Sequence, residues 1–218
     1  MKRFCVIGLG NFGYHVACTL FAEGHEVVAI DMNQSKVQRI HEQVSYAIFG
    51  DAADKEFLKG QGIGDMDAVI VATGERSHLS TLITLYLKEL NVQQILVKVS
   101  DEDHGRIVTR VGATDIIFPE KDMAAKLALS LSRPNILDFI PLAEEYSITE
   151  TAPPAKFIGK SLLELHLRKN YDITIIAIKD VLTGQFFTLP PASHVIKNSD
   201  LLVIIGKTTD IDRACGDG

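Results

Sequence analysis

The stretch Gly8-Leu9-Gly10-Asn11-Phe12-Gly13 directly follows an apolar run at residues 4–7 and opens a segment with helical periodicity. A strand, a glycine-rich turn and a helix in this order are the context that makes such glycine spacing specific for a dinucleotide. Gly8 allows the tight turn, Gly10 lets the backbone approach a phosphate, and Gly13 lets the helix pack closely on the sheet. The helix N-terminus then presents free backbone N–H groups to the anion. We therefore predict a nucleotide-binding turn, and the alternative is a set of glycines that serve only the turn.

Apolar runs and helical patterns alternate from this motif as far as residue 118. The predicted strands are residues 4–7, 27–30, 46–49, 68–72, 95–99 and 116–118, and the predicted helices are residues 12–23, 35–42, 79–90 and 106–111. This alternation indicates a parallel sheet covered on both faces. Because crossovers between parallel strands are right-handed, the sheet is doubly wound and its ligand crevice lies at the carboxyl ends of the strands. The fold class is therefore α/β, with a Rossmann-type domain.

Asp31 ends the second predicted strand, where a carboxylate can accept hydrogen bonds from both hydroxyls of an adenosine ribose. The same negative charge repels a 2′-phosphate. NADP is therefore disfavoured, and NAD, ATP, ADP and AMP stay open as ligands.

Residues at the ends of the next three strands extend the candidate site. Asp51 and Ala52 are placed to meet the adenine edge, but Asp51 is nearly as suitable as a helix N-cap or turn residue. Small residues after the fourth strand leave space for the nucleotide, and Lys98 either faces a phosphate or is an ordinary solvated charge. The binding candidates from the motif and the strand ends are Gly8, Gly10, Asn11, Phe12, Gly13, Asp31, Asp51, Ala52, Thr73, Gly74 and Lys98.

Catalytic machinery is not evident in the sequence. The seven histidines are scattered and form no metal-ligand pair at helical spacing. Only His78 and His104 follow strands on the crevice side, and both are expected to be exposed loop or helix residues rather than general acids. Neither a nucleophile elbow nor a P-loop occurs. A nucleotide site without such groups predicts a binding protein, and the alternative is a small NAD-dependent oxidoreductase.

Composition excludes several classes of protein. Hydrophobic residues make up 46% of the chain and charged residues 23%, which is typical of a globular core and not of a disordered chain or a coiled coil. The net charge of −6 argues against a nucleic-acid partner, because phosphate binding needs clustered Lys and Arg. The apolar runs are far shorter than the roughly 20 residues that span a bilayer, so we expect this chain itself to be soluble. Three cysteines without Cys-x-x-Cys spacing are expected to be reduced thiols.

Beyond residue 118 the pattern becomes that of a small α+β domain. A helical stretch at residues 123–131 is interrupted at Arg133-Pro134-Asn135, because proline breaks or turns a helix. Strands are predicted at residues 147–150, 173–178, 185–189 and 201–206, and one helix at residues 161–168, where Ser161 and Glu164 form a capping box. The predicted divisions are a nucleotide-binding domain at residues 1–134, a linker at 135–142 and a second domain at 143–218.

The whole chain resembles the cytosolic subunits of Trk/Ktr-type potassium transport systems, whose domains are called RCK or KTN domains. The resemblance rests on the glycine motif, Asp31, Gly50-Asp51-Ala52, Phe118-Pro119-Glu120-Lys121-Asp122-Met123, and Ile158-Gly159-Lys160-Ser161-Leu162 with Leu167-Arg168. It implies an N-terminal nucleotide-binding RCK_N domain, a crossover helix that ties two protomers into a dimer, and a C-terminal RCK_C domain.

The resemblance also implies a function and a location. Homodimers of the family assemble into an octameric ring beneath a membrane potassium-translocating subunit of the TrkH/KtrB type. Nucleotides at the dimer cleft change the shape of the ring and thereby open or close the pore. The chain is accordingly expected to be a regulatory subunit and not an enzyme, cytoplasmic and peripheral at the inner face of the cell membrane.

Two further residues take their expected roles from the resemblance. Glu120 matches a carboxylate that some members place near the ligand phosphates, sometimes with a bridging divalent cation; the alternative is an ordinary glutamate in the first turn of a helix. Arg168 matches an arginine that helps to bind cyclic di-AMP in some members. Thr174 stands where those members carry an asparagine, and the alternative role for Arg168 is a helix C-cap.

Asn11 departs from the family pattern. Many nucleotide-gated members carry an arginine there, which reaches the terminal phosphates. Because asparagine has no charge, NAD(H), ADP or AMP is expected to be favoured over ATP. The opposing possibility is that Arg76, Lys98 or Arg106 supplies the missing charge.

Overall fold

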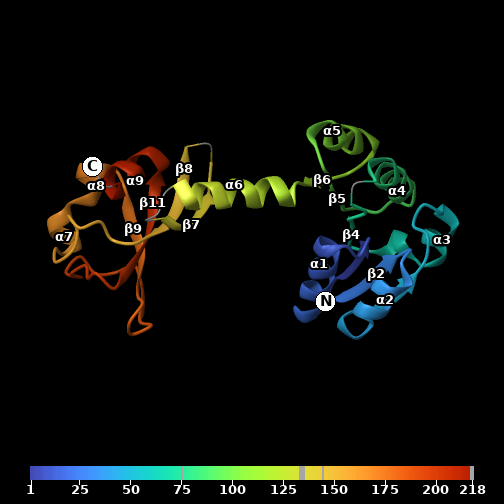
Figure 1. The fold of residues 1–218 in the computed structure, drawn as a ribbon, viewed down its shortest axis with the longest axis horizontal. Helices are drawn as coiled ribbons and strands as arrows, with labels where there is room; N and C mark the ends of the chain where they lie inside the picture. The colour runs from blue at the N-terminus through green and yellow to red at the C-terminus, as the bar shows by residue number, and fades with distance from the viewer. Residues whose placement is uncertain (75, 133–135, 144, 217–218) are drawn as a thin grey trace. The chain divides into compact units, whose positions relative to one another are not determined.

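The computed structural model describes residues 1–74, 76–132, 136–143 and 145–216. The chain divides into two compact units, Met1–Asp122 and Met123–Gly218 (Figure 1). Among the described residues, no helix is both long and apolar enough to cross a membrane.

The first unit is built on a six-stranded sheet in the order β3-β2-β1-β4-β5-β6, in which all pairings are parallel. Its strands are β1 (Arg3–Ile7), β2 (Glu26–Asp31), β3 (Tyr46–Phe49), β4 (Ala68–Val71), β5 (Ile95–Lys98) and β6 (Asp115–Ile117). The strand order reverses between β1 and β4, and a doubly wound sheet opens its crevice at such a point. The predicted α/β Rossmann-type fold is confirmed.

Helices cover both faces of this sheet (Figure 1). They are α1 (Asn11–Ala22), α2 (Gln34–Ile40), α3 (Lys55–Gly60), α4 (Ser77–Glu89) and α5 (Glu102–Val111), with 3-10 turns at His41–Gln43 and Ile63–Asp65. The sequence did not predict α3, because it is too short for a periodic pattern. Its N-cap is Asp54, which accepts hydrogen bonds from the N–H groups of Glu56 and Phe57. Helix α5 begins at Glu102 rather than at residue 106, because Asp101 caps it.

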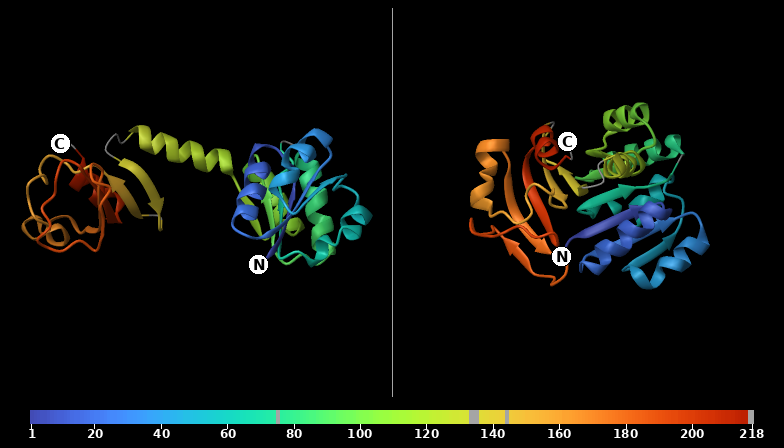
Figure 2. Two further views of the ribbon diagram at one scale, coloured as in Figure 1. Left: turned by 90° about the horizontal axis from the view of Figure 1, so that it is seen from below. Right: turned by 60° about the vertical axis from the view of Figure 1, so that its left-hand side comes forward.

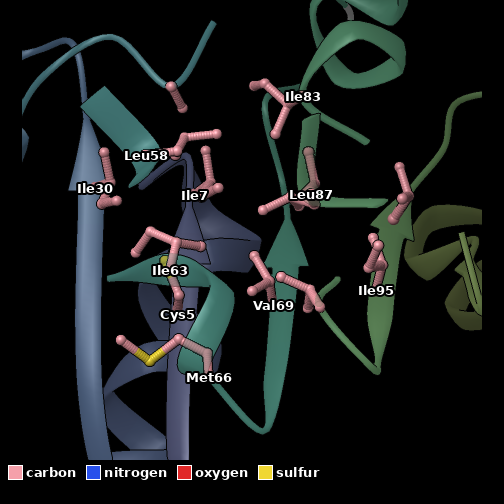
Figure 3. Packing of buried hydrophobic residues seen from close by; sticks show 14 of the residues in the cluster. Cys5, Ile7, Ile30, Leu58, Ile63, Met66, Val69, Ile83, Leu87 and Ile95 are labelled. Atoms are coloured by element: carbon pink, nitrogen blue, oxygen red, sulfur yellow. The ribbon is translucent and has the colours of Figure 1, made fainter. Parts of the chain in front are cut away.

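The apolar side chains of the first unit form two layers, one on each face of the sheet. Successive residues of a strand point to opposite faces, so Cys5 enters one layer and Val6 the other. The layer with Cys5 also contains Leu58 of α3 and Ile83 of α4 (Figure 3), and the layer with Val6 contains Ala17 of α1. Helices α1 and α2 therefore cover one face, and α3, α4 and α5 cover the other.

The three cysteines are free thiols, as predicted. Cys5 is fully buried, and burial raises the pKa of its thiol. Burial also raises the pKa of Cys215 to about 11. Cys18 is half-buried, and its Sγ lies 3.2 Å from Oε1 of Gln43. The Cys5 and Cys215 thiols therefore stay protonated near neutral pH.

Helix α6 (Pro119–Ser132) begins in the first unit and continues without interruption into the second (Figure 2). It contains the predicted helix at residues 123–131 but starts earlier. Proline is well suited to the first helical position, because an N–H there would have no intrahelical partner. The predicted interruption at Arg133-Pro134-Asn135 lies outside the described residues.

The second unit contains a five-stranded antiparallel sheet in the order β10-β9-β11-β8-β7. Its strands are β7 (Ile136–Pro141), β8 (Tyr146–Thr151), β9 (Thr174–Asp180), β10 (Phe186–Thr188) and β11 (Asp200–Lys207), and its own helices are α7 (Leu162–Leu165), α8 (Leu167–Tyr171) and α9 (Thr208–Cys215). Phe157, Ile178 and Leu202 are buried in its core, together with Ile211 of α9. The predicted α+β domain is confirmed.

Two features of the second unit differ from the predictions. Strand β7 pairs with β8, so the linker predicted at residues 135–142 is wrong over Ile136–Pro141. The run ends in Pro141, which is compatible with pairing because β7 is an edge strand and an edge strand tolerates proline. Helix α9 was missed, because its buried residues are few and lie among polar ones.

The helix predicted at residues 161–168 is two short helices. Helix α7 ends at Leu165, His166 adopts a left-handed conformation with φ of 44°, and α8 begins at Leu167. The capping box between Ser161 and Glu164 is confirmed. The pattern could not show the break, because Leu165 and Leu167 are both buried against the core.

Candidate functional site

A pocket of about 310 Å³ lies in the first unit, at the carboxyl ends of the parallel strands. The candidates for nucleotide binding are the eleven residues from the motif and the strand ends, together with Glu120. All of them except Gly13 line this pocket: Gly8, Gly10, Asn11, Phe12, Asp31, Asp51, Ala52, Thr73, Gly74, Lys98 and Glu120. Gly13 lies in the first turn of α1, beneath the glycine turn. The strand ends and the starts of α1, α4 and α6 thus meet around one cavity.

The three glycines of the motif are required for different reasons. Gly8 has φ of +95°, and a Cβ there would lie 2.4 Å from the carbonyl oxygen of Ala72. A Cβ on Gly13 would lie 2.0 Å from the carbonyl oxygen of Gly8. Backbone packing alone therefore excludes a side chain at both positions.

Gly10 has no such packing requirement. Its φ is −68°, and a Cβ there would meet nothing within 4 Å. Gly10 is the N-cap of α1, no side chain caps this helix, and its first turn carries no acidic residue. The open space beside Gly10 therefore leaves the α1 N–H groups accessible from the pocket, which is the arrangement that binds an anion.

Asp31 connects the end of β2 to the glycine turn. Its Oδ2 accepts a hydrogen bond from the N–H of Leu9 at 2.7 Å, and its Oδ1 accepts one from the N–H of Asn33 at 2.8 Å. Each carboxylate oxygen has two lone pairs, so Oδ1 retains capacity for a ribose hydroxyl, whereas Oδ2 also accepts a hydrogen bond from the Lys36 ammonium. The Asp31 side chain is only 9% exposed. The contact with the turn was not predicted, because sequence spacing does not reveal which N–H the carboxylate meets.

Three cationic side chains line the pocket, those of Lys36, Arg76 and Lys98. The Lys98 ammonium forms an ion pair with Glu120 and lies 5.9 Å from the centre of the Phe12 ring. The hydrogen bond from Lys98 lowers the pKa of Glu120. Lys36 lies 3.5 Å from Oδ2 of Asp31. Sequence reasoning missed Lys36, although its position in the first turn of α2 was a signal.

The remaining candidates also line the pocket. Asp51 Oδ1 accepts a hydrogen bond from the N–H of Ala53 at 2.9 Å, so Asp51 is a turn residue that also lines the pocket. Ala52 is buried. The Thr73 hydroxyl is buried and has no hydrogen-bond partner within the described part of the chain. Gly74 has φ of +75°.

The two crevice-side histidines have different environments. His78 is exposed, as predicted. His104 is buried at 4% exposure, so the prediction that it is exposed is wrong. Within residues 1–74, 76–132, 136–143 and 145–216, no group of three or more His, Cys, Asp or Glu side chains is arranged to hold a metal ion.

Arg168 and Thr174 line a second cavity, of about 480 Å³, in the second unit. The Nε of Arg168 donates a hydrogen bond to Oγ1 of Thr174 at 3.2 Å. Arg168 is the second residue of α8, so this contact joins α8 to the start of β9.

Two family models match the chain, that of the TrkA-N domain over residues 4–119 and that of the TrkA-C domain over residues 147–216. Ktr system potassium uptake protein C of Bacillus subtilis (strain 168) is 41% identical over 212 residues, which are 97% of this chain and 95% of that protein. Ktr system potassium uptake protein A of the same organism is 41% identical over 217 residues, 100% of this chain and 97% of that protein. The protein A of Vibrio alginolyticus is 32% identical over 205 residues, 94% of this chain and 92% of that protein.

Solved structures share the fold. The GsuK RCK domain matches with a TM-score of 0.68 at 18% identity, covering 100% of this chain and 48% of that chain. The GsuK channel bound to NAD matches with a TM-score of 0.57 at 21% identity, covering 98% of this chain and 38% of that chain. At these identities the match concerns the fold alone.

Proposed function

Because this chain belongs to the family of Ktr-type potassium uptake proteins, in which a TrkA-N domain precedes a TrkA-C domain, we propose that it is the nucleotide-binding regulatory subunit of a potassium transport system. The observation that carries the proposal is the pocket at the N-terminus of α1. Packing does not require a glycine at position 10, so the missing side chain leaves the N-terminus of α1 open to the pocket. Asp31 lies beside this opening.

The ligand we propose is an adenine nucleotide with little terminal charge, such as NAD(H), ADP or AMP. Asn11 brings no charge to the pocket, and the ammonium group of Lys98 is already paired with Glu120. A diphosphate bridge or a single phosphate can rely on the backbone N–H groups of α1. GsuK, which shares only the fold, has been solved with NAD and with ADP. Both ligands belong to the proposed class.

The residue at position 11 tests this ligand class. We expect competition calorimetry to rank NADH, ADP and AMP at or above ATP in the wild type. Asn11→Arg is expected to strengthen ATP binding selectively, by about 10- to 150-fold, because it adds one charge-assisted phosphate contact of about 1.5 to 3 kcal/mol. Asn11→Gln, which is longer but neutral, is the control and leaves the order unchanged. A tenfold ATP advantage in the wild type that Asn11→Arg does not increase contradicts this role of Asn11.

Asp31→Ala is expected to weaken adenine-nucleotide binding by about 10- to 150-fold, because it removes charge-assisted hydrogen bonds of about 1.5 to 3 kcal/mol. It also lowers the free energy of unfolding by about 1 to 3 kcal/mol, because the N–H of Leu9 loses its acceptor. The matched control is Asp54→Ala. Asp54 also accepts two backbone N–H groups but lies outside the pocket lining, so its loss reduces stability and leaves affinity unchanged. Equal nucleotide affinity in wild type and Asp31→Ala contradicts the ribose assignment.

The mechanism we propose is a change of assembly shape driven by nucleotide binding. A ligand shifts a conformational equilibrium only by its difference in affinity for the two states, and moving it from 1:99 to 99:1 takes roughly 5.5 kcal/mol. In a ring with several nucleotide sites, this difference in binding free energy is shared among the sites. An octameric ring beneath a membrane subunit of the TrkH/KtrB type, with nucleotides at the dimer clefts, is the assembly we propose. The alternative, an NAD-dependent oxidoreductase, predicts NAD reduction with simple alcohols or hydroxy acids.

An apolar stripe on α6 supports the proposed dimer. Met123, Leu127 and Leu131 are spaced by four residues and are 64%, 58% and 75% exposed. Residues at this spacing share one face of a helix, so a second copy of α6 can cover the stripe. The proposed domain division, residues 1–134 and 143–218, assigns this helix to the nucleotide-binding domain.

Two further ligands belong to the proposal. A divalent cation between Glu120 and a bound triphosphate is the first, since hard cations prefer carboxylate and phosphate oxygens. Cyclic di-AMP at the cavity lined by Arg168 and Thr174 is the second, supported by the position of both side chains in that lining. The alternatives are an ordinary glutamate in the first turn of α6 and a helix C-cap role for Arg168.

A further inference from the structure

The imidazole of His104 is buried where α5 meets α4. Its Nε2 lies 2.7 Å from Oγ of Ser80, and that hydroxyl donates its single proton to the carbonyl oxygen of Ser77 at 2.9 Å. The Ser80 oxygen therefore accepts a hydrogen bond from the Nε2–H of His104. The other ring nitrogen, Nδ1, is buried and has no hydrogen-bond partner among the described residues. The buried site therefore fits the neutral ring with its proton on Nε2.

A second proton on this ring would be costly. It would place a buried N–H at Nδ1 without an acceptor and a positive charge away from water. Burial lowers the pKa of His104, and the negative charge of Asp101 opposes this effect. Asp101 also accepts a hydrogen bond from the backbone N–H of His104 at 2.8 Å.

The other charged and titratable groups near this end of α4 and α5 are exposed to solvent. Exposed Asp103 and Arg106 pair with each other on α5, and exposed Glu102 pairs with Lys121 of α6. The groove next to His104 is lined by the titratable residues His78 of α4, Asp101 and Asp103, and by Arg110 of α5. Asp101 is therefore the carboxylate that acts on the His104 ring.

The same turn of α4 borders the nucleotide pocket. Leu79 and Ile83 of α4 line the pocket, as does Arg76 immediately before the helix. The backbone N–H groups of Leu79 and Ser80 donate to the carbonyl oxygen of Arg76 at 3.0 and 3.2 Å. One side of this turn is therefore held by the His104–Ser80–Ser77 hydrogen bonds, and the other side forms the pocket wall.

We propose that His104 is a proton sensor for the nucleotide pocket, in which proton uptake by the ring releases the first turn of α4 and weakens nucleotide binding. This inference rests on the proposed nucleotide-binding function. In this switch the charged ring leaves Ser80 for the groove that His104 lines, and that movement frees the α4 turn.

The sign of the pH dependence follows from the neutral form being favoured in the fold. The contribution of neutral His104 to the free energy of unfolding is fully present above the pKa of this histidine in the unfolded chain, about 6.5. It is lost as the pH falls below that value. Because coupling between two sites is reciprocal, bound nucleotide must also oppose protonation of His104.

The test measures the affinity for NAD by calorimetry from about pH 8 to about pH 5.5, the range in which histidine titrates. NAD is the probe because its diphosphate bridge gains no proton in this range. His104→Gln replaces the Nε2–H with an amide N–H and does not titrate. His78→Gln is the matched control, since His78 is exposed and lines the same groove.

In the wild type and in His78→Gln, the affinity for NAD is expected to fall about fivefold or more on acidification, the lower end of typical coupling between sites. In His104→Gln it stays nearly constant. An equal loss in His104→Gln overturns the proposal. If His104→Gln does not fold, Ser80→Ala replaces it: His104 can still titrate there but no longer holds the α4 turn, so the pH dependence is expected to disappear. Its persistence in Ser80→Ala overturns the proposal.

A ligand-free comparison separates this inference from the proposed function. Without nucleotide, acidification below about pH 6.5 is expected to lower the free energy of unfolding of the wild type more than that of His104→Gln. Parallel curves overturn the proton sensor. Absence of NAD binding to the wild type at pH 8 instead contradicts the proposed nucleotide ligand, and the sensor is then judged by the unfolding curves.

Discussion

Gly13→Ala is expected to lower the free energy of unfolding of the first unit by about 3 kcal/mol or more, the upper range for forcing extra volume into a packed site. The new Cβ would lie 2.0 Å from the carbonyl oxygen of Gly8 and 3.3 Å from the Cβ of Ala72. The contacted oxygen belongs to the backbone of the turn between β1 and α1, and that backbone is held by the hydrogen bond from the N–H of Gly8 to the carbonyl oxygen of Ile30. Relief therefore requires α1 to move away from the sheet. Denaturant unfolding measures the loss.

The control for this substitution is Gly60→Ala. Gly60 ends α3, and a Cβ there meets nothing within 4 Å. Alanine is the better helix former by up to about 1 kcal/mol, so stability is expected to stay the same or to rise. Equal unfolding midpoints for Gly13→Ala and the wild type contradict the packing role of Gly13.

Gly10→Ala is expected to weaken nucleotide binding about 100-fold or more, which corresponds to roughly 2.7 kcal/mol, while the fold is retained. Alanine adopts the Gly10 φ of −68° without strain, and the added methyl group meets no protein atom within 4 Å. Loss of a glycine N-cap costs about 1 kcal/mol at most. The methyl group instead occupies the space through which a phosphate reaches the N–H groups of α1. Calorimetry with NAD measures the affinity.

Gly60→Ala again is the matched control, because it adds the same methyl group away from the pocket lining. It is expected to bind NAD as the wild type does. Wild-type affinity in Gly10→Ala means that no phosphate approaches this turn, and it contradicts the proposed nucleotide site. Gly13→Ala and Gly10→Ala therefore separate two roles within one motif, since one substitution affects folding and the other affects the ligand.

Most of the pocket could be predicted from the sequence, because its residues follow strand ends in a repeating pattern. Parallel strands bring their carboxyl ends to one edge of the sheet, so Asp31, Asp51 and Thr73 meet although they are far apart in the chain. The sequence pattern does not show which groups these side chains bind. The hydrogen bond from Leu9 to Asp31 and the ion pair between Lys98 and Glu120 depend on how the strand ends and helix starts pack.

Two of the wrong predictions, those for His104 and for the linker, share one cause. His104 lies in a polar segment that indicates exposure, but the packing of α4 on α5 buries it. Residues 135–142 follow the predicted interruption at Arg133-Pro134-Asn135 and are predicted as a linker, but Ile136–Pro141 is the edge strand of the second sheet. In both cases the outcome depends on packing against another element, which the local pattern does not describe.

The sequence by itself determined the alternation of strands and helices, the α/β class, the glycine turn with Asp31 at the end of β2, and the capping box of Ser161 and Glu164. These features depend on residues a few positions apart, through the strand period, the helix period and local hydrogen bonds. Only the tertiary structure decided which glycine is free of packing, which histidine is buried and which lysine is paired with a carboxylate. Those properties are set by contacts between separate elements, because burial and charge pairing depend on what covers a residue and not on its neighbours in the chain.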